Sequence, residues 1–238
     1  MKEIDYKGKY FSVLGDSIST LEGYSEPKGA EFYNLTRKLI TGVVTKRDTW
    51  WGQVIERLGG ELLANNSFSG STVCRSKLSE IESYACSDER TSALSKGGIA
   101  PDVIMVSIGT NDWGFKNKVF FDERCDSERD IEYIFSSAYR LMLEKLKKNY
   151  PNTEIWCLTM PRSKCPEEEN GFPFFSKNRF PMDDYCEVIR SSAKEFGCRL
   201  IDLYKNGGVY ETMDDVHPFA EGMKTISKSV LKELNIID

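Results

Sequence analysis

The chain has 238 residues, of which 40% are hydrophobic and 29% are charged. This balance is typical of a soluble globular protein and excludes a disordered one, which would lack the apolar side chains that offset chain entropy. The length fits one domain over residues 1–238. A formal net charge of −5 provides no basic field for phosphate backbones or an anionic membrane surface, so we expect no nucleic acid partner.

The beginning of the chain carries charges where a signal peptide would have its apolar run, and no segment reaches the roughly 20 apolar residues of a membrane span. We therefore expect a cytoplasmic protein, or an exported one if a leader has been removed. Seven cysteines are scattered without a CxxC pair or zinc-ligand spacing. This pattern predicts free thiols and no structural metal.

Five short apolar runs have the length and composition of buried strands. Their bounds are Tyr10–Leu14, Glu61–Ala64, Val103–Ile108, Glu154–Leu158 and Arg199–Leu203.

Four helical patterns lie between or after these runs. One of them has a start signal in Asp48, a capping candidate, and a stop signal in the pair Gly59-Gly60. Another has apolar residues at helical spacing before Pro151. The four helices are predicted over Thr49–Leu58, Glu128–Asn149, Met182–Phe196 and Ala220–Leu234.

Strands that alternate with helices favour a mostly parallel sheet covered on both faces, because right-handed crossovers place the helices there. We therefore predict an α/β three-layer sandwich around a five-stranded, mostly parallel sheet. Ligands of such sheets bind beyond the carboxyl ends of the strands, so the loops that follow the strands are where chemistry is expected.

Three segments lack a clear period and are predicted to be surface insertions: Ser19–Arg47, Ser76–Gly98 and Pro161–Phe180. The last is rich in aromatic residues, which predicts local packing, a substrate wall or a contact between subunits of a homo-oligomer. Three tryptophans near polar loops, Trp50, Trp51 and Trp113, could pack in the core or offer flat faces to a sugar ring.

Three of the loops after strands carry small polar residues. The first strand runs into Gly15-Asp16-Ser17-Ile18, which places the Ser17 hydroxyl on a tight turn. The second is followed by the polar loop Asn65–Ser71, in which Gly70 would let a backbone N–H approach a ligand closely. The third is followed by Gly109-Thr110-Asn111-Asp112. Taken singly, each segment is more often an ordinary turn or helix cap.

The fifth strand is followed by Asp214-Asp215-Val216-His217-Pro218, and His217 is the one histidine of the chain. No other side chain titrates near neutrality without a large shift of its pKa. A lone histidine is usually structural. Here a serine, a glycine loop and an asparagine are expected at the same end of the sheet as His217, and this combination favours a catalytic role for His217.

These four segments, in this order, resemble the four motif blocks of the SGNH hydrolases, also called the GDSL family, over residues 11–222. The first block reads GDSI instead of GDSL, and the third, GTND, matches in full. The resemblance implies the flavodoxin-like SGNH fold, with Ser17 as nucleophile, Asp214 as acid and His217 as base. It also implies an oxyanion hole formed by Ser17, Gly70 and Asn111.

A serine hydroxyl is too weakly acidic to attack an ester at neutral pH unless a base takes its proton, and His217 is the candidate. Asp214 would orient the imidazole, with Asp215 as the alternative that the sequence leaves open. The reaction would pass through an acyl-enzyme on Ser17 and needs no metal or organic cofactor. Activity should rise with pH along one limb with an apparent pKa of about 6 to 7.

The expected substrate is a small-molecule ester with a short acyl group, and O-acetylated carbohydrate is suggested by analogy with the family. A lysophospholipase or thioesterase would use the same groups. Other classes remain as alternatives: a noncatalytic binding module on this fold, or a glycosidase that uses Asp16 with Asp214 or Asp215. The glycosidase leaves Ser17 and Asn111 without a role.

Overall fold

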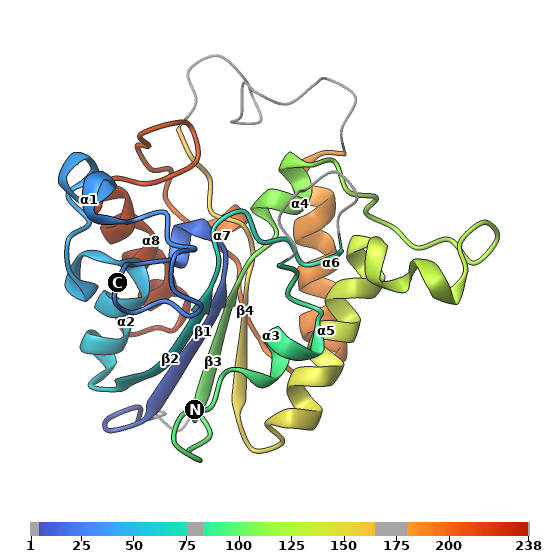
Figure 1. The fold of residues 1–238 in the computed structure, drawn as a ribbon, viewed down its shortest axis with the longest axis horizontal. Helices are drawn as coiled ribbons and strands as arrows, with labels where there is room; N and C mark the ends of the chain where they lie inside the picture. The colour runs from blue at the N-terminus through green and yellow to red at the C-terminus, as the bar shows by residue number, and fades with distance from the viewer. Residues whose placement is uncertain (1–4, 76–82, 165–179, 238) are drawn as a thin grey trace.

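The structure, a computed structural model, describes residues 5–75, 83–164 and 180–237. Its centre is a five-stranded sheet in the order β2-β1-β3-β4-β5 with all neighbours parallel (Figure 1). The carboxyl ends of the strands therefore meet at one edge, at the top of Figure 1. The strands are β1 Tyr10–Gly15, β2 Glu61–Ser67, β3 Val103–Ser107, β4 Glu154–Leu158 and β5 Arg199–Ile201.

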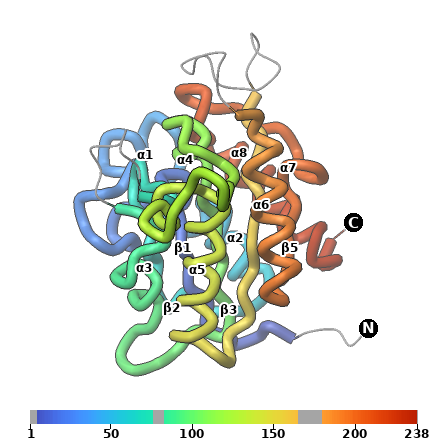
Figure 2. Tube along the Cα trace, turned by 90° about the vertical axis from the view of Figure 1, so that its right-hand side faces the viewer, coloured from blue at the N-terminus to red at the C-terminus, as the bar shows by residue number. Residues whose placement is uncertain are grey.

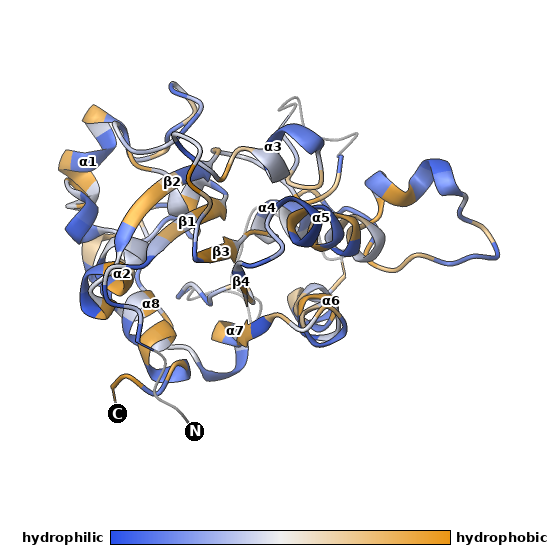
Figure 3. Ribbon diagram, turned by 90° about the horizontal axis from the view of Figure 1, so that it is seen from below, coloured by the Kyte–Doolittle hydropathy of each residue, from blue (hydrophilic) through white to orange (hydrophobic). Residues whose placement is uncertain are grey.

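Helices cover both faces of this sheet, which confirms the predicted α/β three-layer sandwich. On one side lie α1 (Leu35–Thr41), α2 (Trp50–Leu58) and α8 (Ala220–Glu233), and on the other α3 (Asp88–Ser92), α5 (Phe135–Asn149) and α6 (Met182–Glu195). Figure 2 shows α5 and α6 in front of the sheet, and Figure 3 shows the apolar strands between the two layers. Within the described residues, no helix is both long and apolar enough to cross a bilayer.

Alternate residues of each central strand face opposite layers, as the two-residue period of a strand requires. In β1, Phe11 and Val13 pack toward α2 and α8, whereas Leu14 packs toward α5 and α6. All five residues of β3 are buried, which is typical of a parallel strand covered on both faces.

The tryptophans near the polar loops belong to these two cores. Trp50 and Trp51 are 0% exposed in the layer of α2 and α8, and Trp113 is 0% exposed in the layer of α5 and α6. The interpretation that they offer flat faces to a sugar is therefore wrong.

Four strand ends differ from the prediction: those of β1 and β3 by one residue, and those of β2 and β5 by more. Asn65, Asn66 and Ser67 continue β2 and pair with β1, although the sequence places them in a loop. At the other side of the sheet, β5 stops at Ile201, because Leu203 begins the short helix α7 (Leu203–Asn206), which Asp202 caps by accepting the N–H of Lys205.

The start of α2 also differs. Thr49, not Asp48, caps the helix, and its hydroxyl accepts the N–H of Gly52. The Asp48 carboxylate instead accepts the N–H of Thr45 at 2.7 Å, across the 3₁₀ turn Lys46–Asp48. The predicted stop is confirmed, since Gly59 ends α2 in the left-handed conformation at φ +71°.

The pattern over Glu128–Asn149 forms two elements rather than one helix. A 3₁₀ segment, Glu128–Tyr133, is followed by an extended residue, Ile134, and then by α5. The extended residue lets the first two N–H groups of α5 donate to the carbonyls of Lys118 and Val119, both at 2.8 Å. The first N–H groups of a helix have no acceptor within the helix, and here a neighbouring segment supplies the acceptors.

The predicted insertions are described in part. Ser19–Arg47 carries α1, and the later half of Ser76–Gly98 carries α3. Most of the aromatic segment Pro161–Phe180, including Phe172, Phe174 and Phe175, lies outside the described residues. The described Phe180 packs edge-on against Phe120, with ring centroids 6.5 Å apart.

Leu146 in α5 provides a test of the core. It is 0% exposed, whereas Leu39 in α1 is 80% exposed. We predict that Leu146→Ala lowers the free energy of unfolding by about 2–5 kcal/mol, because it removes buried apolar contacts and leaves a cavity. Leu39→Ala should change it by less than about 0.5 kcal/mol. Urea denaturation followed by circular dichroism measures both, and equal losses would contradict the packing of α5.

Candidate active site

The candidate nucleophile lies directly after β1. Ser17 begins a short 3₁₀ helix, Ser17–Ser19, whose N-cap is Asp16; the Asp16 carboxylate accepts the N–H of Ile18 at 3.0 Å. Gly15 has no room for a side chain, since an added Cβ would lie 2.7 Å from the Cβ of Ser19 and 2.8 Å from the Oγ of Ser67. The glycine therefore allows the turn to close and places the Ser17 hydroxyl at the carboxyl edge of the sheet.

Ser17, His217 and Asp214 form one chain of hydrogen bonds. The Oγ of Ser17 lies 2.8 Å from Nε2 of His217, and Nδ1 of the same ring lies 2.9 and 2.8 Å from the two carboxylate oxygens of Asp214. Asp214 also accepts the backbone N–H of His217 at 2.8 Å. No hydrogen bond joins Asp215 to the ring. Of the two carboxylates that the sequence leaves open, Asp214 is the one in contact.

Burial and hydrogen bonding shift the pKa values of both titrating groups, Asp214 and His217. Burial alone would raise the pKa of Asp214. Hydrogen bonds from His217 and from the N–H of Val216, together with the charge of the imidazolium, outweigh burial and hold this pKa below its ordinary value. Burial lowers the pKa of His217, Asp214 opposes this effect, and the charge of Arg37 adds to it; the pKa lies below the ordinary value. The neutral imidazole is therefore favoured.

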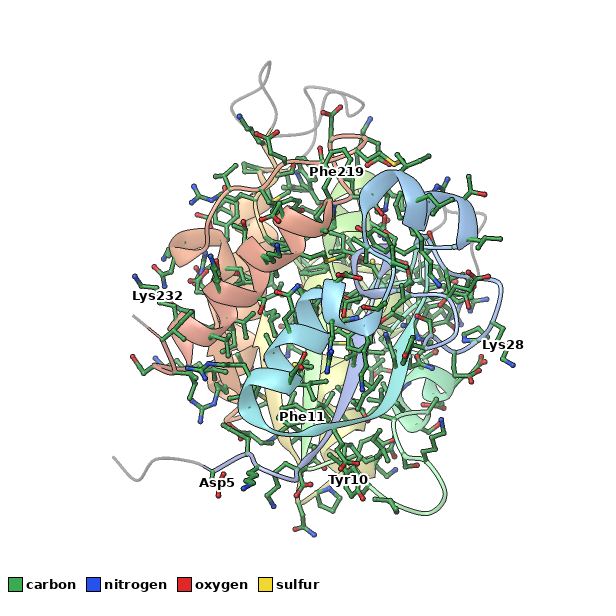
Figure 4. All side chains as sticks on the ribbon, turned by 90° about the vertical axis from the view of Figure 1, so that its left-hand side faces the viewer. Asp5, Tyr10, Phe11, Lys28, Phe219 and Lys232 are labelled. Atoms are coloured by element: carbon green, nitrogen blue, oxygen red, sulfur yellow. The ribbon has the colours of Figure 1, made fainter. Side chains whose placement is uncertain are left out.

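Two buried tyrosines hold the loop that carries His217. The hydroxyl of Tyr33 donates to the carbonyl of Pro218 at 2.9 Å, and that of Tyr210 donates to the carbonyl of Val216 at 3.2 Å. These bonds flank His217 on both sides in sequence. Phe219 then starts α8, at the upper end of the face shown in Figure 4, opposite the end where Tyr10 begins β1.

The outer side of the imidazole is covered by the insertion Ser19–Arg47. The ring of Phe32 stacks on His217 with centroids 3.3 Å apart and planes 10° apart. The guanidinium carbon of Arg37 lies 4.2 Å from the centroid of the same phenyl ring. The sequence offers no signal for either contact, since both residues lie in a segment without motif or period.

The three hydrogen-bond donors that the sequence predicts for an oxyanion hole are the N–H groups of Ser17 and Gly70 and the amide of Asn111. The N–H groups of Ser17 and Gly70 donate to no acceptor in the described part of the chain. Gly70 has φ +79°, a conformation that favours glycine. Asn111 uses one amide proton to bond the carbonyl of Ser71 at 2.8 Å, which orients its amide and leaves the second proton for a ligand.

Asp112, the fourth residue of the GTND segment, connects the segment that follows Gly70 to the helix that carries Asn111. Asp112 is 0% exposed and accepts the N–H groups of Val73 and Cys74 at 2.7 and 3.1 Å, the thiol of Cys74 at 2.9 Å and the amide of Asn117 at 3.2 Å. Burial raises the pKa of Asp112 to about 6, although these four bonds oppose the rise. Asp112 thus ties the segment after Gly70 to α4 (Thr110–Gly114), which carries Asn111.

Arg90 is a site residue that the sequence did not reveal. It is 4% exposed, and its guanidinium donates to the carbonyls of Gly15 at 3.0 Å and Asn66 at 2.7 Å, and to the hydroxyls of Ser71 and Ser83, both at 2.6 Å. It also bonds the side-chain oxygen of Asn66. One buried cation thus joins the ends of β1 and β2 to the glycine loop. A lone arginine in a polar segment carries no sequence signal for such a role.

One hollow in the described structure lies away from this site. A hollow of about 940 Å³ runs along the free edge of β2, and Trp51, Ile55, Leu63 and Lys96 are among its lining residues. Neither Ser17 nor His217 lines it. Among the described residues, no group of three or more His, Cys, Asp or Glu side chains is placed to hold a metal ion.

Comparison with known proteins identifies the family of the chain. The family model of GDSL-like lipase/acylhydrolase matches residues 9–168. The chain belongs to this family. It is therefore a hydrolase of ester bonds. A comparison with curated protein sequences finds no match.

Solved structures share the fold over almost the whole chain. A candidate GDSL-like lipase from Bacteroides ovatus is 24% identical with a TM-score of 0.72, and the match covers 97% of this chain and 100% of that one. A second, from Bacteroides uniformis, is 26% identical with a TM-score of 0.69 and 97% coverage of both chains. Est24, a carbohydrate acetylesterase from Sinorhizobium meliloti, is 11% identical with a TM-score of 0.66, covering 95% of this chain and 98% of its own.

The network around Arg90 leads to a stability prediction. Arg90→Met should lower the free energy of unfolding by about 3–5 kcal/mol, because it leaves several buried acceptors without donors. Arg140→Met is the matched control, since the Arg140 side chain is 52% exposed and pairs with Glu195 at the surface; it should cost less than about 1 kcal/mol. Urea denaturation measures both. A loss at Arg90 no larger than at Arg140 would show that the buried bonds do not hold these loops together.

Proposed function

We propose that the protein is a serine esterase that cleaves small acyl esters through Ser17, His217 and Asp214. The observation that carries the proposal is the continuous chain of hydrogen bonds from the Ser17 hydroxyl through both ring nitrogens of His217 to Asp214. The order of groups and the distances are those that serine acyl transfer requires.

In the proposed reaction, His217 takes the proton of Ser17 at Nε2 while the Ser17 oxygen attacks the acyl carbonyl. Asp214 holds Nδ1–H and stabilises the imidazolium that forms. The tetrahedral intermediate expels the alcohol, which receives the proton from Nε2, and leaves an acyl-enzyme on Ser17. A water molecule then attacks in the same way and releases the acid.

The negative oxygen of the intermediate would be bound by the N–H groups of Ser17 and Gly70 and by the side-chain amide of Asn111. Their availability as donors supports this role. Each donor would contribute roughly 3 kcal/mol to transition-state stabilisation, because it is already oriented when the charge develops.

O-acetylated carbohydrate is the proposed substrate class. The similarity in fold to a carbohydrate acetylesterase supports it, as does the similarity to a family two carbohydrate esterase from Clostridium thermocellum (TM-score 0.58, 14% identity, covering 95% of this chain and 63% of that one). The glycosidase alternative is disfavoured, because Asp16 is buried as a helix cap and Asp214 is bound to His217. A binding module is disfavoured by the complete set of reacting groups.

A lysophospholipase is the second candidate, and one surface favours it. Helix α1, whose Arg37 lies on the ring stacked against His217, exposes Leu35, Leu39 and Ile40 by 72%, 80% and 58%. Apolar side chains beside a catalytic site suit a substrate with a long acyl chain. A series of p-nitrophenyl esters from acetate to palmitate separates the two: a maximum of kcat/KM at acetate supports the acetylesterase, and one at long chains the lysophospholipase.

Mutation of the proposed catalytic groups tests the chemistry. With p-nitrophenyl acetate at pH 7.5 and a chelator present, Ser17→Ala and His217→Ala should each lower kcat by about 10⁴-fold or more, and the double variant little further. Asp214→Asn should lose about 10³-fold or more, because the imidazole would adopt the wrong tautomer. Asp215→Asn is the matched control and should retain most of the activity. Turnover unchanged in Ser17→Ala would overturn the proposal.

The pKa of His217 sets the expected dependence on pH. The base must be neutral to accept the serine proton, so kcat/KM should rise with pH through the pKa of His217 and then reach a plateau. Because burial lowers this pKa, the midpoint should lie on the acidic side of the ordinary value for histidine. Initial rates from pH 4.5 to 8 at constant ionic strength measure it. A flat profile would remove His217 from the role of base.

A further inference from the structure

The phenyl ring of Phe32 has a different group on each face. The imidazole of His217 stacks on one face, with centroids 3.3 Å apart, and the guanidinium of Arg37 covers the other, 4.2 Å from the centroid. Phe32 is 4% exposed, so little of the ring is left for solvent. A single aromatic ring thus separates a fixed positive charge from the imidazole that would accept the serine proton.

Hydrogen bonds fix this ring relative to the nucleophile. The hydroxyl of Thr20 donates to the carbonyl of Ser17 at 2.8 Å and accepts the N–H of Phe32 at 2.9 Å. Asn34 caps α1 by accepting the N–H of Arg37 at 3.2 Å, which sets the first turn of the helix above Phe32. The segment that carries the ring is therefore tied to the loop of Ser17 as well as stacked on His217.

The charge of Arg37 is not neutralised by a carboxylate. Within residues 5–75, 83–164 and 180–237, its guanidinium makes no ion pair and no hydrogen bond, and its contact is with Phe32. The next residue, Lys38, differs: its ammonium lies 3.4 Å from the carboxylate of Glu22 and donates to the carbonyl of Glu22 at 3.2 Å. Two cations in the same turn of α1 thus have different surroundings.

Few charged groups face the imidazole. Burial has the largest effect on the pKa of the imidazole and lowers it; Asp214, on the same loop as His217, raises the pKa, and the charge of Arg37 on α1 adds a smaller lowering. Tyr33 and Tyr210, which pack behind the loop, stay neutral because burial raises the pKa of each. Asp16 lies behind Ser17, and burial raises its pKa to about 7. Besides burial, one negative and one positive group therefore act on the protonation of His217.

We propose that Phe32 and Arg37 are positioning residues for His217: Phe32 fixes the plane of the imidazole so that Nε2 meets Ser17, and Arg37 disfavours the imidazolium. A phenyl face attracts a cation, but cations on opposite faces of one ring repel each other, whereas a neutral imidazole suffers no such repulsion. The neutral base then persists into weakly acidic solution. The imidazolium formed during catalysis also returns its proton to the leaving alcohol more readily. The proposal rests on the serine-esterase function above.

The single histidine allows a direct test. In protein without a histidine tag, the imidazole C–H proton resonances belong to His217 alone, so a proton NMR titration gives its midpoint without assignment. Arg37→Gln should move the midpoint to higher pH, and Arg37→Glu should move it further. Arg37→Lys, which keeps the charge, should stay close to the wild type. Lys38→Gln is the matched control, since it removes the same charge from the same turn, and should also stay close.

Kinetics should follow the titration. On the acidic limb, Arg37→Gln should lower kcat/KM for p-nitrophenyl acetate by about two- to threefold, and the difference should vanish on the plateau and shrink in high salt. Phe32→Leu should lower kcat by about three- to tenfold with little change in KM, because the ring of His217 loses its fixed plane; a thermal melt verifies that this variant is folded.

The outcomes separate this proposal from the function on which it rests. An unchanged or lower midpoint in Arg37→Glu, or an equal shift in Lys38→Gln, would overturn the role of Arg37, even if Ser17 proves essential. An unchanged kcat in folded Phe32→Leu would overturn the role of Phe32. Since the titration needs no turnover, it remains decisive for Arg37 if Ser17→Ala shows that the proposed reaction is wrong.

Discussion

The hydrogen bond of 2.8 Å between Ser17 and His217 joins two loops that are 200 residues apart in sequence. No local element holds these loops together, so the bond depends on the geometry of the sheet. Parallel strands bring the end of β1 and the segment after β5 to the same edge. Gly15 then lets the first loop turn tightly, and the hydroxyls of Tyr33 and Tyr210 fix the second. The remaining elements of the site serve to keep this distance.

Two buried ionisable side chains organise the other half of the site. Arg90 binds backbone carbonyls and hydroxyls, and Asp112 binds backbone N–H groups, a thiol and an amide. Burying such groups is unfavourable unless their hydrogen bonds are satisfied. Here the bonds go to the segments that carry Gly70 and Asn111, so the cost of burial is offset in the segments whose donors are proposed to bind the negative oxygen of the intermediate.

Periodicity and motif order were sufficient to predict the sheet, the helices α2, α5, α6 and α8 and the segments in which Ser17, Gly70, Asn111 and His217 lie. They did not predict α1 or α3, which lie in segments without a clear period. These features are local, since each depends on spacing within a short stretch of chain. The break at Ile134 was missed because the carbonyls that accept the N–H groups of Phe135 and Ser136, those of Lys118 and Val119, lie in another segment.

The same limit applies within the site. Asp214 and Asp215 are neighbours with the same side chain, and the choice between them depends on the backbone of the loop, which takes φ +67° at Asp215 and places the Asp214 carboxylate on the imidazole. Arg90 and Phe32 lie in segments without a motif, and their roles arise from contacts with β1 and with His217. A single sequence does not encode such long-range pairs in a visible pattern.

The thiol of Cys74 gives this architecture an internal reporter. Cys74 is 0% exposed, and its thiol donates to the same Asp112 oxygen that accepts the backbone N–H of Cys74. Burial, more than the nearby charge of Asp112, raises the pKa of this thiol well above its ordinary value. An alkylating reagent needs an exposed thiolate, so it reaches this sulfur only when the segment detaches from Asp112. The rate of Cys74 labelling therefore measures how often the loop beside Gly70 opens, in the intact enzyme and without substrate.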